Sequence, residues 1–317
     1  MTNLSAIQAA ETRIRDTSIE TPLVRFASLS SELGTEVLLK QENLQATGSF
    51  KVRGALNKIL SLREQGELPP IVAASTGNHG AAVAFATRSV GASATVFVPA
   101  NTKPRKLALM RELGAEVRIH GEDGVEAEIE ARRWSETNAA CYVSPYNDRD
   151  IIAGQGTVAL EILRQAPELD AIFVALGGGG LVAGVAAATR ELSGSTRVFG
   201  CSPDPSAVMI RSVAAGEILE LPSHPTLSDG TAGGVEKDAI TFPLVRDLVS
   251  DFVIVPETAT RRAFREYLGT HSEPIEGAAA MTLAACRLQA GQFAGGTVAV
   301  ILCGGNVDEA VLREIAG

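Results

Sequence analysis

Short apolar runs alternate with amphipathic helical patterns along most of the 317 residues of the chain. Strands that are apolar on both faces and alternate with helices are typical of parallel sheets covered by helices on each side. Such runs occupy residues 71–75, 94–99, 115–120, 141–146, 170–176, 196–202, 251–256 and 297–303. These units are more numerous than one simple doubly wound sheet needs, so the pattern predicts an α/β protein of two open, twisted lobes that face a cleft. Residues 217–234 are the least regular stretch and are expected to form a long loop or connection.

One helical pattern begins beside a lysine. Val52, Leu56 and Ile59 recur at helical spacing, and Gly66 then ends the pattern. Lys51 is therefore predicted to lie in or near the first turn of this helix. The helix macrodipole disfavours an ammonium group there by a few tenths of a kcal/mol to roughly 1 kcal/mol. A helix selected only for stability would carry Asp or Glu at this point.

Composition and charge exclude several classes of function. A net charge of −9 argues against a nucleic-acid or anionic-membrane partner. The four cysteines form no C-x-x-C pair, and the four histidines show no metal-ligand spacing, so no metal site is expected. The N-terminal segment lacks the apolar core of a signal peptide, and no apolar run reaches the ~18 residues that span a bilayer. We therefore expect a soluble cytoplasmic protein.

Three loops follow predicted strands, at the sheet edge where parallel α/β proteins bind ligands. The turn "STGNHG" (75–80) offers hydroxyls and backbone N–H groups to a carboxylate, although a plain capped turn would have the same residues. The run "GGGG" (177–180) costs backbone entropy and suits the close approach of a phosphate. The segment "CGGN" (303–306) places a thiol where it could contact a flat ligand, although buried cysteines are commonly inert.

The lysine and these three loops could line one cleft. Lysine forms Schiff bases with carbonyl compounds, and burial or a helix N-terminus favours its reactive neutral amine. A phosphate-bearing aldehyde cofactor held by lysine is pyridoxal 5'-phosphate. The combination therefore predicts this cofactor.

The chain resembles the pyridoxal-phosphate enzymes of fold type II, whose fold is that of the tryptophan synthase β subunit. The similarity rests on "GSFKVRGA" (48–55), the three loops above, "PYNDRDIIAGQGTVALEI" (145–162) and "SEPIEGAAA" (272–280), in this order. The nearest group is the serine/threonine dehydratases and serine racemase, and residues 224–249 look closer to the hydroxyectoine-utilisation branch. The resemblance implies a large cofactor-binding domain of residues 1–64 and 148–317 and a small domain of residues 65–147 that closes on the substrate.

The resemblance also implies a role for each matching residue. Lys51 would hold the cofactor as a Schiff base and would then remove the α-proton of the substrate. Thr76 stands where serine racemase has its second acid/base group. The residues implied at the cofactor are Phe50, Lys51, Asn78, Gly177, Gly178, Gly179, Gly180, Glu273 and Cys303. The residues implied at the substrate carboxylate are Ser75, Thr76, Gly77 and His79.

The implied reaction is elimination of water from a β-hydroxy amino acid, such as L-threonine or L-serine, which gives a 2-oxo acid and ammonia. A hydroxyectoine-derived amino acid and 3-hydroxyaspartate stay open, the latter slightly disfavoured because no lone arginine can be assigned to a second carboxylate. Serine racemisation is an alternative activity on the same cofactor. A nicotinamide-dependent oxidoreductase is a weaker alternative, because no acidic ribose partner follows the glycine run. A catalytically silent binding module is a third.

Further expectations rest on the same resemblance. A homodimer is expected by analogy. Many relatives bind a divalent cation through a glutamate where this chain has Ser202-Pro203, so no metal is expected there. The chain ends soon after the last motif, which favours a catabolic enzyme without a regulatory domain.

Overall fold

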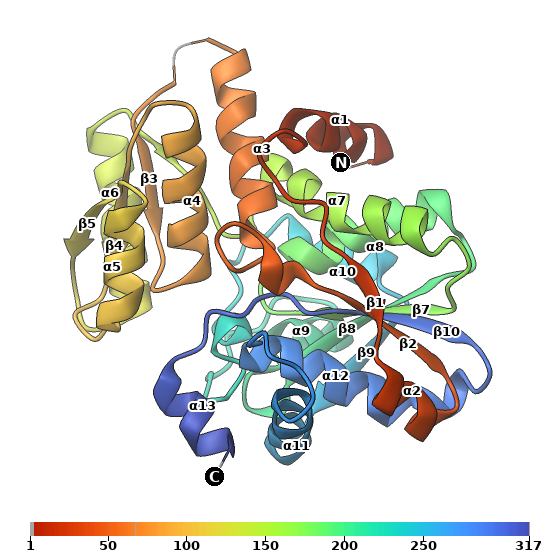
Figure 1. The fold of residues 1–317 in the computed structure, drawn as a ribbon. Coiled ribbons are helices and arrows are strands. Elements are labelled where there is room, and N and C mark those ends of the chain that lie inside the picture. The colour runs from red at the N-terminus through yellow and green to blue at the C-terminus, as the bar shows by residue number, and fades with distance from the viewer. Residues whose placement is uncertain (1–2, 67, 317) are drawn as a thin grey trace.

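The alternating apolar runs form two separate sheets in the computed structural model, which describes residues 3–66 and 68–316 (Figure 1). The strands are β1 (Leu23–Arg25), β2 (Glu36–Lys40), β3 (Ile71–Ala74), β4 (Ala94–Val98), β5 (Glu116–Ile119), β6 (Cys141–Tyr142), β7 (Ala171–Ala175), β8 (Arg197–Pro203), β9 (Asp251–Val255) and β10 (Thr297–Ile301). The helices are α1 (Leu4–Ile14), α2 (Ala27–Leu33), α3 (Lys51–Glu64), α4 (Asn78–Ser89), α5 (Pro104–Glu112), α6 (Gly124–Thr137), α7 (Arg149–Gln165), α8 (Gly180–Leu192), α9 (Val208–Ala215), α10 (Thr241–Leu248), α11 (Glu257–Leu268), α12 (Gly277–Gln289) and α13 (Glu309–Ala316). Four 3-10 turns are η1 (Glu42–Leu44), η2 (Asp204–Ser206), η3 (Asp229–Thr231) and η4 (Ala290–Gln292).

The larger sheet has six strands in the order β1-β2-β10-β7-β8-β9. All neighbours pair in parallel except β1 and β2, which are antiparallel. Helices α7, α8 and α10 lie on one side of this sheet and α11 and α12 on the other (Figure 1). This arrangement explains why β7 (Ala171–Ala175) is apolar at every position, because both of its faces are buried.

The smaller sheet has four parallel strands in the order β5-β4-β3-β6. Successive side chains of a strand point to opposite faces. Ile71 and Ala73 accordingly belong to the apolar cluster formed with α3 and α4, while Val72 packs with Ala127 and Ala131 of α6. Both faces are covered, as the sequence pattern predicts, and the fold of two α/β lobes is confirmed.

Helix α3 connects the two lobes. Its apolar residues Val52, Leu56 and Ile59 are fully buried in the cluster of the smaller sheet, and the helix also packs along α7. Lys51 is the first residue of α3, where the sequence places it. The chain therefore presents Lys51 at the junction of the two lobes.

Some boundaries differ from the sequence prediction. The strand expected at 141–146 ends at Tyr142, because Ser144 forms a turn in which its Oγ accepts the backbone N–H of Asn147 (3.0 Å), and Pro145 has no N–H to give to a sheet. Helix α4 begins at Asn78, within the stretch 75–80 that the sequence predicts as a turn.

The irregular stretch expected at 217–234 is confirmed, with the 3-10 turn η3 as its regular element. Within residues 3–66 and 68–316, no helix is long and apolar enough to cross a membrane.

Candidate active site

Lys51 lies in a cavity between the lobes. Its Nζ donates a hydrogen bond to the carbonyl oxygen of Pro145 (2.9 Å) and lies 5.2 Å from the centre of the Phe50 ring. Burial lowers the pKa of Lys51 to about 8, and the nearby Glu276 and Cys303 oppose this change. A substantial share of the amine is therefore neutral near pH 8, and a neutral amine is the form that attacks a carbonyl carbon.

The cavity brings together residues from both lobes in a volume of about 180 Å³. The sequence-predicted residues that line it are Phe50, Lys51, Ser75, Thr76, Gly77, Asn78, His79 and Cys303. The structure adds Lys106, Pro145, Asp229, Gly230, Glu276, Ala278 and Asn306. Segments more than 200 residues apart in the sequence therefore meet at one lysine, as in Asn78 and Asn306, which are 228 residues apart.

The loop 75–79 joins the end of β3 to the start of α4. The backbone N–H of Gly77 donates to Ser75 Oγ (3.2 Å), which fixes the turn. His79 is buried, and its Nε2 lies 2.8 Å from the carbonyl oxygen of Val143. Burial, together with the charge of Lys51, lowers the pKa of His79 to about 3, so the ring is neutral and Nε2–H donates to that carbonyl. A carboxylate at this loop would meet hydroxyls and backbone N–H groups at a helix N-terminus.

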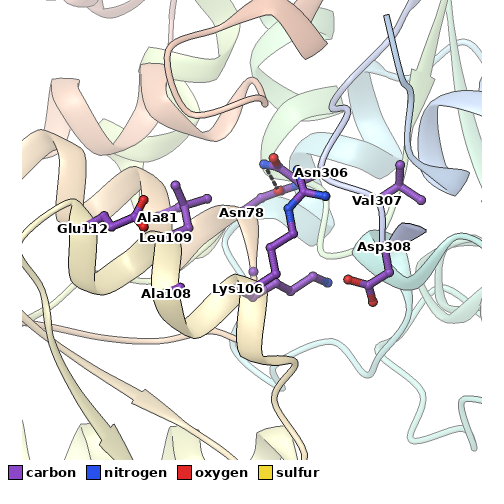
Figure 2. Close-up of a pocket in the computed structure, with 11 residues that line it drawn as sticks. Asn78, Ala81, Lys106, Ala108, Leu109, Glu112, Asn306, Val307 and Asp308 are labelled. Carbon is purple, nitrogen blue, oxygen red and sulfur yellow. Dashed lines mark hydrogen bonds between the residues drawn. The ribbon is translucent and has the colours of Figure 1, made fainter. Parts of the chain in front are cut away.

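Glu276 is a cavity residue that sequence reasoning missed. Its Oε2 accepts a hydrogen bond from Asn78 Nδ2 (2.8 Å), and its Oε1 lies 3.6 Å from Cys303 Sγ. Burial raises the pKa of Glu276 to about 7 and holds that of Cys303 well above its usual range, so the thiol stays protonated. Asn78 Oδ1 in turn accepts a hydrogen bond from Asn306 Nδ2 (2.7 Å; Figure 2). These bonds fix the orientation of the Asn78 amide.

Glu273, the glutamate that the sequence places at the cofactor, is exposed and does not line the cavity. Both glutamates belong to the same motif, and Glu276 immediately precedes α12, a helix whose first ten residues are all buried. The sequence signal that could have identified Glu276 is an acidic residue directly before a strongly apolar helix, because the N-terminus of a helix favours a negative charge. Glu276 therefore replaces Glu273 as the candidate residue.

The glycines 177–180 follow β7 and lead into α8, whose first residue is Gly180, and protein atoms approach them closely. A Cβ at Gly178 would lie 2.4 Å from the Tyr146 ring, and one at Gly177 would lie 2.9 Å from the carbonyl oxygen of Thr231. Gly179 has a φ of +91°, which favours glycine. The protein's own packing therefore accounts for part of the requirement for glycine at this loop.

Pro145 connects the glycine loop to Lys51. Its carbonyl oxygen accepts the Lys51 hydrogen bond and lies 3.6 Å from the position of a Cβ at Gly180. A group bound to the lysine is thus within reach of the backbone N–H groups at the start of α8, which suit a phosphate. With the Phe50 ring and the Asn78 amide beside it, this donor set fits a phosphate-bearing aldehyde such as pyridoxal phosphate.

A buried ionic network holds the first turn of α3. Arg53 Nε lies 2.7 Å from Glu42 Oε2, and its Nη1 lies 2.6 Å from Glu161 Oε1. Lys40 Nζ lies 2.6 Å from Glu161 Oε2. The side chains of all four residues are at most 6% exposed, so two positive and two negative charges compensate one another away from water. This network positions the helix turn that carries Lys51.

No group of three or more His, Cys, Asp and Glu side chains is arranged to hold a metal ion in the described parts of the chain. The absence of a metal site stays a prediction from the sequence.

Comparisons with known proteins identify the family of the chain. A family model described as pyridoxal-phosphate dependent enzyme matches residues 14–304. The L-threonine ammonia-lyase of Geobacter sulfurreducens is 38% identical over 303 residues, covering 95% of this chain and 75% of the relative. The L-threo-3-hydroxyaspartate ammonia-lyase of a Pseudomonas species is 36% identical over 302 residues, covering 95% of this chain and 94% of the relative. The structure of maize serine racemase superposes with a TM-score of 0.92 at 32% identity, covering 99% of this chain and 96% of the other. The chain belongs to the family of pyridoxal-phosphate dependent enzymes.

Proposed function

We propose that this enzyme is an ammonia-lyase that eliminates water from a β-hydroxy amino acid and releases a 2-oxo acid and ammonia. The observation that carries the proposal is Lys51, a buried amine with a pKa lowered to about 8, beside a loop suited to a carboxylate. The similarity to ammonia-lyases over nearly the whole chain supports the same activity. Pyridoxal phosphate, when bound, supplies an electron-withdrawing ring that makes the α C–H bond of the substrate acidic.

The residues of the cavity have separate roles in binding the substrate and transferring its proton. Ser75, Thr76 and Gly77 bind the substrate carboxylate and thereby orient the α C–H bond toward Lys51. Lys51 Nζ takes the α-proton, the Cβ–O bond breaks, and the hydroxyl leaves as water, so that the α-proton is transferred in net terms through Lys51 to the leaving group. Water then hydrolyses the released enamine to the 2-oxo acid and ammonia, so the reaction has no net oxidation or reduction.

Racemisation is a second candidate activity, because the Thr76 hydroxyl lines the same cavity as Lys51. A second acid/base group opposite the lysine would return the α-proton to the other face. The β-methyl of threonine makes Thr76 stiffer at χ1 than a serine, which favours elimination as the main reaction. Chiral analysis of serine incubated with the enzyme distinguishes the two, since D-serine without matching pyruvate would indicate a racemase.

The test of the proposed function is a Lys51→Ala variant with Lys237→Ala as its matched control, because the Lys237 side chain is 83% exposed. Wild type and Lys237→Ala should bind pyridoxal phosphate covalently, seen as an absorbance band that survives gel filtration and shifts on borohydride reduction. They should also release ammonia and 2-oxo acid from a panel of β-hydroxy amino acids. Lys51→Ala should do neither. Wild-type protein that stays colourless with added cofactor would refute the proposal and revive the oxidoreductase alternative.

The lobe assignment is part of this proposal, with residues 1–64 and 148–317 as the cofactor domain and 65–147 as the substrate-closing domain. The smaller sheet is built from residues 71–142, which supports the bounds 65–147 for the substrate-closing domain. Assembly as a homodimer stays a prediction from the family resemblance, and a cytoplasmic location stays a prediction from the composition of the chain.

A further inference from the structure

Two cations stand where the Lys51 cavity opens into a wider cleft. Arg105 and Lys106 follow Pro104 in the first turn of α5, and both line this cleft of about 380 Å³. The cleft, shown in Figure 2, shares Gly77, Asn78, Lys106 and Asn306 with the cavity, so the two are continuous. Lys106 is the one of the two cations that also lines the inner cavity.

Lys106 lies directly beside the loop that suits a carboxylate. Its Nζ is 3.6 Å from the position of a Cβ at Gly77, and its side chain is 22% exposed. The Lys106 ammonium is therefore held near the loop 75–79 rather than extended into solvent. An anionic group one or two bonds beyond the β-carbon of a substrate would fall within its reach.

Lys106 forms an ion pair with Asp229 that contributes little stability. Asp229 Oδ2 lies 3.4 Å from Lys106 Nζ and belongs to η3 on the other side of the cleft, with its side chain 66% exposed. Exposed ion pairs of this kind contribute only ~0–1 kcal/mol. A substrate carboxylate in the less exposed cavity can therefore replace Asp229 at little cost.

Asp308 and Glu112, the acidic residues of the outer cleft (Figure 2), do not line the cavity around Lys51. The two acidic residues of the inner cavity are Asp229, the exposed partner of Lys106, and Glu276, which is hydrogen-bonded to Asn78. The inner wall beside Gly77 thus carries the Lys106 cation, and exposed Arg105 adds a second one at the rim. Charge at this point favours an acidic substrate side chain over a methyl group or hydrogen.

We propose that Lys106, assisted by Arg105, forms a subsite for a second carboxylate, and that the substrate is a dicarboxylic β-hydroxy amino acid of four carbons. The inference rests on the proposed β-elimination and specifies its substrate. The α-carboxylate binds the loop 75–79, and the side-chain carboxylate binds Lys106 in place of Asp229. The α C–H and Cβ–O bonds break, water leaves, and hydrolysis of the enamine gives a four-carbon 2-oxo dicarboxylic acid and ammonia. The sequence alone had assigned no arginine to such a group, because the position of Arg105 beside the cavity depends on the packing of α5.

The kinetic test compares 3-hydroxyaspartate with threonine and serine on the holoenzyme. Wild type should prefer the dicarboxylic substrate. In Lys106→Met, kcat/KM for 3-hydroxyaspartate should fall by about 10- to 100-fold, mainly through KM, as expected for loss of a charged hydrogen bond. The kcat/KM for threonine should fall by less than about threefold. Arg105→Met should have a smaller effect in the same direction. Equal losses on all three substrates in Lys106→Met would mean that Lys106 serves the α-carboxylate or the lobe contact, and would overturn the proposal.

Asp229→Asn separates substrate recognition from lobe bridging. It removes the competitor of the substrate carboxylate while Lys106 keeps its charge, so the KM for 3-hydroxyaspartate should fall. If Lys106 only bridges the lobes, Asp229→Asn and Lys106→Met will raise KM alike for every substrate, which would refute the subsite.

Calorimetric binding of unreactive acids provides a readout without turnover. Succinate should bind wild-type holoenzyme at least about 10-fold more tightly than butyrate, and Lys106→Met should abolish the difference. Equal binding of the two acids to wild type, with turnover of threonine or serine intact, would overturn the subsite and leave the lyase function standing. Lys106-dependent succinate binding without release of ammonia from any substrate would support the subsite and overturn the lyase function.

Discussion

Replacing Glu276 with glutamine should change how the stability of the cofactor-free protein depends on pH. Burial raises the Glu276 pKa from its ordinary 4.5 to about 7, so between these values the folded protein binds a proton that the unfolded chain releases. The resulting stabilisation is fully present below pH 4.5 and is lost as the pH rises through about 7. At ~1.36 kcal/mol for each pH unit, this amounts to about 3 kcal/mol, most of which disappears between pH 5 and pH 8.

Urea denaturation from pH 5 to pH 8, followed by circular dichroism, measures this quantity. The free energy of unfolding of wild type should fall relative to that of Glu276→Gln by about 2–3 kcal/mol across the range. Lys51 contributes in the opposite direction in both proteins, because its pKa is lowered, and loss of the Glu276 charge lowers that pKa further. Glu273→Gln is the matched control, since Glu273 is exposed and outside the cavity, and should follow wild type. Parallel pH curves for wild type and Glu276→Gln would refute the reasoning.

Two further substitutions test the packing around the site. Gly178→Ala should cost about 1–3 kcal/mol of unfolding free energy by thermal denaturation and weaken phosphate binding, because its Cβ would lie 2.4 Å from the Tyr146 ring. Gly194→Ala, with nothing within 4 Å of its Cβ, is the control, and equal losses in the two variants would contradict the packing argument. Arg53→Met should cost about 3–5 kcal/mol in urea denaturation, because it leaves Glu42 and Glu161 short of a buried partner. Arg313→Met removes an ion pair of an 81% exposed side chain and should cost less than about 1 kcal/mol, so a loss as small in Arg53→Met would show that the network adds little stability.

The sequence predicted those features that depend on local patterns. Runs apolar at every position, such as 171–175, identified parallel strands because only strands covered on both faces need them. The position of Lys51 followed from the helical period of the residues after it. The short strands β1 and β2 were not predicted. Strand β2 ends in Lys40, whose charged side chain is fully buried, so the hydrophobicity pattern does not identify β2 as an inner strand.

Features that depend on long-range packing were not predicted from the sequence. Glu276 and Glu273 are three residues apart in one motif, and only the path of the chain into α12 decides which of them enters the cavity. Lys106 resembles any helix lysine in sequence, yet α5 places its Nζ beside Gly77. The buried partners of Arg53 come from η1 and α7, 11 and 108 residues away, so no local pattern could assign them.

Burial acts on the two ionisable groups of the cavity in opposite directions. It lowers the pKa of Lys51 to about 8 and raises that of Glu276 to about 7, so both groups move toward their neutral forms. The exclusion of water that produces both changes depends on contact between the lobes. Two ion pairs connect the smaller lobe to residues 229–236 of the larger lobe. One joins Lys106 to Asp229 and the other joins Arg132 to Glu236. Separation of the lobes would rehydrate the cavity and return the pKa of Lys51 toward its ordinary value of 10.5. Contact between the lobes therefore favours the neutral amine on which the chemistry of Lys51 depends.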